Sequence, residues 1–422
     1  MNEQLRFSPT RIVLTVTLPF ALGHFLSYLY RNVNAVIADD LTREAGLDAT
    51  GLGLLTAAYF LSFALFQIPL GMLLDRFGPR RVQATLLLVA AVGALVFSFA
   101  SDLHWLTVGR AFIGIGVAGG LMSAFKANVM WWPVEKLPSA NAGFMALGSL
   151  GALAATKPVE QVLAYTDWRG LFLGLAVVTV MAAGTILTVV PERPGISGGV
   201  GGSLRDALGG VRTVLASRVF WRLAPLCVTM HAALLGYQGL WAGPWIRDVE
   251  RLDRAATATA LSWTAVALIV GFLSLSVLVE RARRVGIAPA GVMLIGAVPT
   301  LLAQALLLLQ LPGMSTPLWV AFALFGTTSM LPYAVLQQHF PQALAGRVGT
   351  AMNLLVFSSV FGMQSGVGWI IDLFPVAAGG GYAVEGHRTG LAVVLGLQIL
   401  ALAWFLAWRR SAPIPIRVPP AP

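Results

Sequence analysis

A few ionisable side chains lie inside long apolar runs of this sequence, where charged residues are rare. Arg31, Arg110, Lys157 and Glu160 are among them. A charge at the depth of a membrane is costly to bury and usually marks a ligand site or a proton path. Three cations beside one carboxylate predict a site for an anion. In such a site arginine holds a carboxylate or phosphate through two hydrogen bonds, and lysine acts as a point charge.

Several of these charges also have a structural interpretation. Arg31 could extend its side chain to the outer headgroups of the membrane. Lys157 and Glu160 lie one helical turn apart and could pair with each other, or Glu160 could carry a proton. These alternatives stay open at the level of the sequence.

Histidines and neutral polar residues of the same runs extend the candidate site. His24 and His231 lie in the middle of their runs, where they could carry protons or form hydrogen bonds that pack helices. The predicted substrate-binding set adds Tyr28, Gln161, Gln238, Trp241, Tyr333 and Asn353, and further candidates are Tyr59, Gln67, Gln337 and Gln364.

The sequence carries no pattern for an enzyme, a metal site or a nucleotide site. Its single cysteine, Cys227, excludes an internal disulfide and a zinc site built from cysteines. The glycine-rich segment 198–202 lacks the lysine of a phosphate-binding loop, and no set of nucleophile, base and acid stands out. We therefore expect no catalytic residue, no metal and no cofactor, and an ion gradient as the energy source.

The composition predicts that these residues are positioned by helices surrounded by lipid. Of 422 residues, 57% are hydrophobic and 11% are charged, whereas soluble domains carry about a quarter charged residues. Apolar runs of about 20 residues predict membrane-spanning helices. The twelve predicted spans are 12–33, 52–74, 83–101, 105–127, 139–163, 169–190, 219–246, 256–279, 286–310, 317–339, 347–371 and 389–408.

The spans fall into two groups of six, which predicts an all-α integral membrane protein with two pseudo-symmetric bundles. Residues 1–190 are the expected N-terminal bundle, 191–218 a cytoplasmic linker, and 219–422 the C-terminal bundle. The linker starts with Gly and Pro and continues as an amphipathic helix, expected on the membrane surface, or else as a solvated connector. Its apolar face is Leu204, Ala207, Leu208, Val211, Val214 and Leu215, after a capping box at Ser203 and Asp206.

The basic residues predict the orientation of the chain. The net charge is +10, and most Lys and Arg lie in short loops on one side of the spans, which indicates membrane topology rather than nucleic-acid binding. That side, with both termini, is expected to face the cytoplasm, so the acidic loop 39–48 faces outside. No cleavage site follows the first apolar run, which predicts a retained first helix in the inner membrane.

One loop carries a charged motif directly after the second predicted span. The stretch GMLLDRFGPRRV (71–82) has an echo, SVLVERARRVG (276–286), which ends the eighth span. Glu280 and Arg281 stand there in the places of Asp75 and Arg76. Matching loops in two halves are typical of transporters built from parallel repeats.

The stretch 71–82 resembles the G-x-L-a-D-r-x-G-r-k signature of the major facilitator superfamily. RAFIGIGVAGG, which contains Arg110, is similar to the family's R-x-x-x-G-x-G pattern, and DWRGLF (167–172) is similar to its WR-x-x-F. The resemblance covers residues 10 to 410 and implies two bundles that rock about a central site. It also gives Arg110 a structural alternative, because this arginine matches a framework position of the family.

The resemblance implies that the motif is a latch at the cytoplasmic face and not a substrate site. Asp75 would face the start of the eleventh span at Gly346–Arg347, where a carboxylate satisfies free backbone N–H groups. Glu280 would face the start of the fifth span at Ser139, and the arginines would clamp the carboxylate or contact anionic lipid. The predicted gating set is Gly71, Asp75, Arg76, Gly78, Arg80, Arg81, Glu280, Arg281 and Arg347.

Together these patterns predict a secondary active transporter, expected to be a monomer, that moves a small organic anion with protons. Membrane lipid and the small-molecule substrate are its expected partners, and nucleic acid is not. Two alternatives stay open: efflux of a hydrophobic cation, and a membrane sensor with the same fold that does not transport. Pro158 follows Lys157 and not the glycine of the family's antiporter signature, which weighs mildly against drug–proton antiport. Substrate, direction and coupling ion stay open.

Overall fold

The computed structural model describes residues 8–133, 136–192, 204–287, 289–341, 344–376 and 381–409. Every regular element within these ranges is a helix. Helices suit so apolar a chain because each backbone N–H and C=O finds its partner within the same segment, which lipid cannot provide. Eight described helical stretches are long and apolar enough to cross a membrane.

Each of the twelve predicted spans coincides with a helix or with consecutive helices. The elements are α1 (Pro9–Ile12), η2 (Val13–Thr17), α2 (Leu18–Asn32), α3 (Asn34–Glu44), α4 (Ala49–Phe99), α5 (Leu103–Val117), α6 (Gly120–Trp131), α7 (Leu137–Ala154), α8 (Lys157–Leu163), α9 (Trp168–Val189), α10 (Leu204–Leu215), α11 (Arg218–Gly236), η4 (Tyr237–Trp241), α12 (Ala242–Glu250), α13 (Arg254–Arg284), α14 (Pro289–Leu307), α15 (Ser315–Gly326), η5 (Thr327–Met330), α16 (Leu331–His339), α17 (Ala345–Asp372) and α18 (Val384–Arg409).

Helix α4 contains two of the predicted spans, which are joined at a kink. Gly78 there has a φ of 76° and a ψ of 163°, a conformation that glycine adopts without the strain a Cβ would cause. Pro79 follows and lacks the backbone N–H that a continuous helix would use. The Gly78–Pro79 pair of the charged motif therefore ends one membrane-spanning helix and starts the next.

The first span continues beyond its predicted end. Helix α3 follows α2 almost directly, although residues from 39 onward were expected in a loop. Ile37 and Leu41 are fully buried and lie one turn apart, so they hold this segment against the bundle as a helix. Asp39, Asp40 and Glu44, which suggested a loop, lie within this helix.

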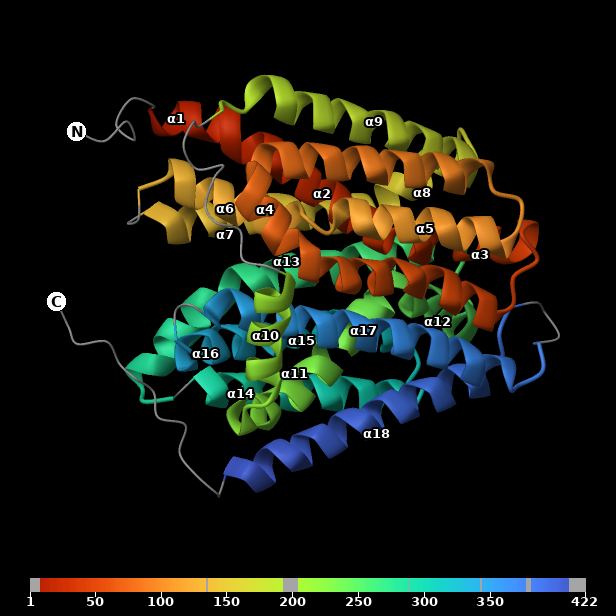
Figure 1. Cartoon of the computed structure of the whole chain (residues 1–422). Coiled ribbons are helices and arrows are strands. Elements are labelled where there is room, and N and C mark those ends of the chain that lie inside the picture. The colour runs from red at the N-terminus through yellow and green to blue at the C-terminus, as the bar shows by residue number, and fades with distance from the viewer. Residues whose placement is uncertain are drawn as a thin grey trace, which may run out of the picture.

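The helices form two groups that lie side by side (Figure 1). Helices α1 to α9 fill the upper part of that view and α11 to α18 the lower part. We call the end where α1 begins and α18 ends the termini end (left), and the end that carries α3 and α12 the α3 end (right). Helix α17 packs along α4, and α13 packs against α7 and α8, so these contacts join the two groups.

Helix α10 crosses the long helices instead of running along them (Figure 1). Val211 and Val214 are buried, and the helix contacts α4, α11 and α17. Part of the predicted apolar face therefore packs on protein, against both groups of helices, while Leu208 is exposed. The predicted cap at Ser203 lies outside the described residues.

Candidate functional site

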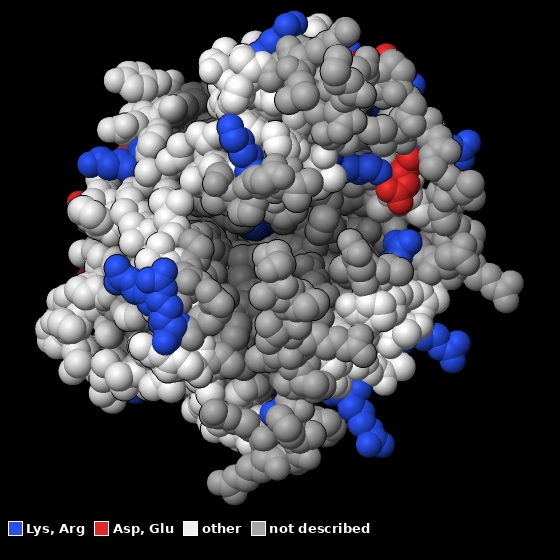
Figure 2. Space-filling model, turned by 90° about the vertical axis from the view of Figure 1, so that its left-hand side faces the viewer, with Lys and Arg blue, Asp and Glu red and all other residues white. Residues whose placement is uncertain are grey.

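A cavity lies between the two groups of helices, near the middle of their length. It holds about 710 Å³ of empty space, a figure that includes its open mouth. Figure 2 looks onto the termini end and shows this face hollowed near its centre. The lining residues are His24, Ser27, Tyr28, Arg31, Phe63, Gln67, Val117, Ala118, Leu121, Met122, Met145, His231, Leu234, Leu235, Leu268, Phe272, Met330, Tyr333, Asn353 and Phe357.

One face of helix α2 supplies four polar residues to this cavity. His24, Ser27, Tyr28 and Arg31 follow the spacing i, i+3, i+4 and i+7, which places them along one side of a helix. All four are buried. The spacing is visible in the sequence and indicates a polar stripe, although sequence reasoning considered three of these residues singly and passed over Ser27.

Arg31 is the single Lys or Arg among the described residues of the lining, and these residues include no Asp or Glu. Its Cζ atom lies 4.9 Å from the ring centroid of Tyr28, 5.7 Å from that of Phe63 and 5.5 Å from that of Phe357. Ring faces attract a cation at these distances, and the rings come from both groups of helices. The buried Nε of Arg31 has no hydrogen-bond partner among the described residues.

His24 lies two turns before Arg31 on the same face of α2. Its imidazole stacks on Phe144 with centroids 4.8 Å apart and meets the Tyr28 ring edge-on at 5.0 Å. Both ring nitrogens are buried, and neither has a hydrogen-bond partner in the described part of the chain. A buried polar atom without a partner is rare and calls for an explanation.

A glycine on α7 makes room for this imidazole. A Cβ at Gly148 would lie 2.1 Å from His24 Cδ2, whereas a Cβ at Gly143 on the same helix would meet nothing within 4 Å. We expect Gly148→Ala to displace the His24 ring and to cost about 1 kcal/mol of stability by overpacking. Gly143→Ala is the matched control and should be neutral or slightly stabilising. Thermal unfolding of the two variants measures this, and equal melting temperatures would contradict the packing described here.

The opposite wall of the cavity carries polar groups that are already paired. The Tyr333 hydroxyl donates to Asn353 Oδ1 (2.9 Å), and Asn353 Nδ2 donates to Gln67 Oε1 across the two groups (3.3 Å). Gln67 Nε2 in turn donates to the Ala118 carbonyl at 3.3 Å. His231 Nδ1 lies 2.9 Å from Ser329 Oγ. These groups satisfy one another, in contrast to those of α2.

The structure therefore brings half of the predicted substrate-binding set together. The members that line the cavity are His24, Tyr28, Arg31, His231, Tyr333 and Asn353. The members that do not line it are Arg110, Lys157, Glu160, Gln161, Gln238 and Trp241.

Arg110 is fully buried inside the first group of helices, away from the cavity. Its Nη1 donates to the Tyr30 carbonyl at 2.8 Å, and its Cζ lies 5.1 Å from the ring centroid of Tyr59. The side chain therefore ties α5 to the backbone of α2, and its expected role at the substrate stays a prediction that this cavity does not support.

Lys157, Glu160 and Gln161 do not line the cavity, and span 139–163, which contains them, is not one continuous helix. Helix α7 ends at Ala154, and α8 begins after Thr156, whose φ of −103° and ψ of −118° are not helical. The break changes which side of the chain faces the cavity. Lys157 and Gln161 are exposed and Glu160 is half-buried.

Gln238 and Trp241 lie in the π-helical segment η4, which contacts α2, α3 and α4 of the first group as well as α11, α12 and α17 of its own. Trp241 is fully buried and donates from Nε1 to the Gln364 carbonyl at 3.0 Å. Both residues were expected at the substrate, and the structure places them in helix packing. The side chain of Gln337 lies outside the described structure.

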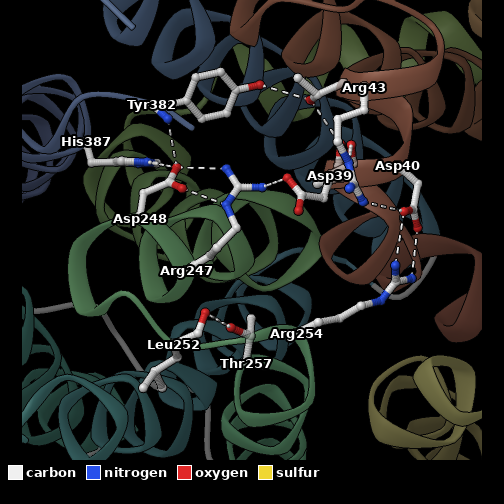
Figure 3. A network of polar contacts seen from close by, with 12 residues as sticks. Asp39, Asp40, Arg43, Arg247, Asp248, Leu252, Arg254, Thr257, Tyr382 and His387 are labelled. Atoms are coloured by element: carbon white, nitrogen blue, oxygen red, sulfur yellow. Dashed lines mark hydrogen bonds and ion pairs between the residues drawn. The ribbon is translucent and has the colours of Figure 1, made fainter. Parts of the chain in front are cut away.

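A polar network joins the two groups at the α3 end (Figure 3). Arg247 of α12 donates to Asp39 of α3, and to the two carboxylate oxygens of Asp248 at 2.6 and 2.8 Å. Arg254 of α13 donates to both oxygens of Asp40 at 3.0 and 2.8 Å. Bidentate pairs of this kind are strong and hold a defined geometry.

Further hydrogen bonds reinforce this closure. Asp248 also accepts hydrogen bonds from His387 Nε2 (3.0 Å) and from the Tyr382 N–H (3.1 Å). At the same end, Asp372 of α17 accepts the first N–H groups of α4, from Ala49 (3.1 Å) and Thr50 (2.6 Å), as a helix cap does. Sequence reasoning missed these residues as a functional set.

A signal for the network was present in the sequence. Asp39 and Asp40 lie in the segment predicted outside, and Arg247 and Arg254 belong to the few basic residues predicted on that same side. Because these opposite charges were predicted on the same side of the membrane, their ion pairs could have been predicted from the topology alone.

The charged motif at the termini end makes its described ion pairs within the first group. Asp75 pairs with Lys126 of α6 at 2.6 Å. Asp75 was predicted to face the start of α17. In this conformation its described ion-pair partner is instead Lys126, a lysine of its own bundle. Arg80 and Arg81 pair with Glu192 at 3.0 and 2.9 Å, and the hydrogen bond and charge of Arg81, with the charge of Arg80, lower the pKa of Glu192.

The remaining gating residues lie around this motif. The Arg347 side chain lies against Gly71 of α4 and Gly210 of α10. Arg76 has its Cζ 5.2 Å from the ring centroid of Phe77, and Arg281 is exposed. The side chains of Glu280 and Ser139 lie outside the described structure, so their expected contact stays a prediction.

The described ranges contain no group of three or more His, Cys, Asp or Glu side chains placed to hold a metal ion. The single cysteine, Cys227, is buried and lies 3.0 Å from the Ser329 carbonyl. The chemistry available in the cavity is therefore one cation, two histidines, several amide and hydroxyl groups, and a wall of aromatic and aliphatic side chains.

Residues 20–365 match the family model described as Major Facilitator Superfamily. The chain is 22% identical over 395 residues to the "Probable L-galactonate transporter" of Escherichia coli. This match covers 86% of this chain and 84% of that protein. It is 33% identical over 159 residues to the "Probable sulfoacetate transporter SauU" of Cupriavidus necator. That match spans 37% of either protein, so the chain covers little more than a third of this relative.

A solved structure has the same fold. It is a bacterial homologue of the human lysosomal transporter Spinster, in an inward-facing and unoccupied conformation, with a TM-score of 0.74 and 18% sequence identity. The match covers 98% of this chain and 100% of that one.

Proposed function

The chain belongs to the major facilitator superfamily, and on this basis we propose that it is a secondary transporter for a small organic anion, coupled to protons. The observation that carries the proposal is Arg31, a buried cation in a central cavity whose lining contains no carboxylate. A buried charge without a partner is costly, and an anionic cargo would supply that partner. Relatives named as L-galactonate and sulfoacetate transporters support an organic anion.

In the transport cycle we propose, the two ends of the protein close alternately. The α3 end, joined by the Asp39–Arg247 and Asp40–Arg254 pairs, is the outer gate. The hollowed termini end, where Lys and Arg outnumber acidic residues on the described surface (Figure 2), faces the cytoplasm, as basic residues favour. This arrangement is then the inward-facing state, and closing the termini end would open the α3 end.

Protons would be carried by histidine in this proposal, since the cavity lining offers no Asp or Glu. His24 and His231 both line the cavity, and imidazole is the side chain whose unperturbed pKa lies closest to physiological pH. A proton on His24 or His231, next to Arg31, would favour binding of an anion. The proton and the anion would then be released together.

Flux through the purified protein in liposomes tests the proposed function. L-Galactonate, sulfoacetate, tartrate and nicotinate, each with and without an inward proton gradient, are suitable cargoes because relatives are named for them or for close analogues. We expect at least one anion to enter faster than into empty liposomes, and faster with the gradient. A protein that moves none of them under either condition, or that moves cationic dyes instead, would overturn the proposal.

We propose that Asp75 leaves its ion pair with Lys126 and contacts the start of α17 when the termini end closes. Asp75→Asn should then slow transport by about tenfold, a coupling of the size usual between conformations, while substrate affinity changes little. Its ion pair is partly exposed, so stability should fall by less than about 1 kcal/mol. Flux and binding on one preparation measure this.

Glu192→Gln is the matched control for this variant. It removes a carboxylate that also pairs with basic residues at the termini end but has no proposed partner on the second group. Equal slowing in both variants would count against the exchange of Asp75.

A further inference from the structure

We infer that the cargo is a monoanion with an apolar, preferably aromatic body and one further hydrogen-bonding group, held by Arg31 at its anionic end and by His24 at the other group. This inference rests on the proposed function and narrows it to a substrate class. The inference rests on two groups on one face of α2: the cation of Arg31 and the imidazole of His24, whose nitrogens have no hydrogen-bond partner among the described residues. Aromatic rings and aliphatic side chains line much of the remaining cavity.

Charge balance favours one negative charge. The lining residues contain one cation, Arg31, and no second Lys or Arg. Unless His24 or His231 is protonated, a dianion such as tartrate would bring one charge into the cavity without a counter-charge, and the desolvation of an uncompensated ion costs several kcal/mol. A monoanion leaves Arg31 and its ligand neutral as a pair.

Hydrogen-bond accounting limits the polar groups of the cargo. Across the cavity, Tyr333, Asn353 and Gln67 are bonded to one another, and His231 has Ser329. On α2, by contrast, Arg31 Nε and both nitrogens of His24 lack partners among the described residues. On α2 the free capacity is therefore an anion site and an imidazole, which offers one donor and one acceptor, whereas His231 has only Nδ1 paired within the described structure, with Ser329. A polyhydroxylated sugar acid would have to break the paired wall to satisfy its hydroxyls.

The rest of the cavity surface favours a flat apolar body. Phe63 and Phe357 pack with centroids 4.4 Å apart, one from each group of helices, and both rings lie next to the Arg31 cation. The lining continues with leucine and methionine side chains. Aromatic bodies gain from such surfaces by burial and by offset or edge contacts. His24 itself presents a ring held by Phe144.

Binding to the full-length purified protein tests the inference. The probes are benzoate, the three hydroxybenzoates, the three pyridine carboxylates, benzamide, L-tartrate and L-galactonate, compared by thermal shift and by dissociation constants. We expect benzoate to bind, and the best hydroxybenzoate or pyridine carboxylate to bind roughly tenfold more tightly, as one added hydrogen bond of about 1.4 kcal/mol allows. Benzamide, tartrate and galactonate should bind at least roughly tenfold more weakly than benzoate, a difference of about 1.4 kcal/mol.

The variant His24→Phe assigns the second contact. It keeps a ring to stack on Phe144 but removes both nitrogens, so benzoate affinity should persist while the advantage of the hydroxyl or ring nitrogen disappears. Circular dichroism and the melting temperature without ligand check that this variant folds. A retained advantage in folded His24→Phe would overturn the role of His24.

Two other outcomes separate this inference from the proposed function. Tight binding of tartrate or galactonate that is lost in Arg31→Gln would overturn the monoanionic apolar class and leave anion transport standing. Absence of binding by every anion, or binding that survives in Arg31→Gln, would count against the anion site and thus against both.

Discussion

Arg31→Gln is expected to lower the affinity for the transported anion by roughly a hundredfold and to reduce flux to the level of empty liposomes. Truncating one partner of a buried charged pair costs about 2–5 kcal/mol, and about 3 kcal/mol corresponds to the hundredfold change. Glutamine keeps hydrogen-bonding capacity and leaves the surrounding rings of Tyr28, Phe63 and Phe357 in place. The loss would therefore report on the charge.

The same variant should not lose stability without ligand. Arg31 is buried and has no carboxylate in the lining, so replacing it with a neutral residue removes a desolvation cost. We expect an unchanged or higher melting temperature for the ligand-free protein, together with loss of the thermal shift by anions. Lost binding in a protein that is also destabilised would point to misfolding instead of a missing counter-charge.

Lys157→Gln is the matched control for Arg31→Gln. Both lysine and arginine were candidates for the anion site, but Lys157 is exposed after the break between α7 and α8. Neutralising it should leave affinity within about twofold, because an exposed charge is screened by water and salt. An equal loss in both variants would place the anion elsewhere than in the central cavity.

Arg247→Ala is expected to destabilise the protein by about 3 kcal/mol, because it removes the arginine partner of buried Asp248 within the second group, and to remove the ion pair with Asp39 that joins the two groups at the α3 end. Arg247 bridges Asp39 of the first group and Asp248 of the second (Figure 3). The Asp248 side chain is only 4% exposed, and breaking a buried pair from one side costs about 3–5 kcal/mol. The loss should shift the conformational equilibrium away from the arrangement described here.

Accessibility of a cysteine on α3 measures that shift. Val36 is buried one turn before Asp39 and lines the crevice next to Arg247, so Val36→Cys, in a chain whose Cys227 is replaced by Ala, can report opening. A membrane-impermeant maleimide added outside cells should label it faster in the Arg247→Ala background. The melting temperature of the purified variant should fall as well.

Arg254→Ala is the matched control at the same end. Its partner is Asp40, and the arginine side chain is 41% exposed, so the expected cost is about 0.5 kcal/mol with little added labelling. If Arg247→Ala labels no faster than Arg254→Ala, the network does not hold the gate.

The placement of the helices was largely predictable from the sequence. Every predicted span falls within a helix or consecutive helices, since a run of about 20 apolar residues can satisfy its backbone in lipid only in helical form. Gly78 and Pro79 mark the kink within α4 in the same local way. The errors of the span prediction lie at helix ends, such as α3, where burial of Ile37 and Leu41 outweighed an acidic composition.

The site was predictable only in part. The alignment of His24, Tyr28 and Arg31 along one face could be predicted from the sequence, because residues on one helix keep a known angular spacing. Lys157 and Glu160 lie after a break, because the non-helical Thr156 between α7 and α8 changes that angle. Pro158 at the start of α8 was the local signal of this boundary.

The sequence by itself determined the class of the protein, its helical spans and the motif that identifies its family, because each depends on residues close together in the chain. Only the tertiary structure decided which charges share a space: Arg31 with rings of both groups, Asp75 with Lys126, and Asp39 with Arg247. The physical reason is that such pairs join separate helices. Their distance depends on how the helices rotate and pack, and side chains from the whole bundle set that packing together.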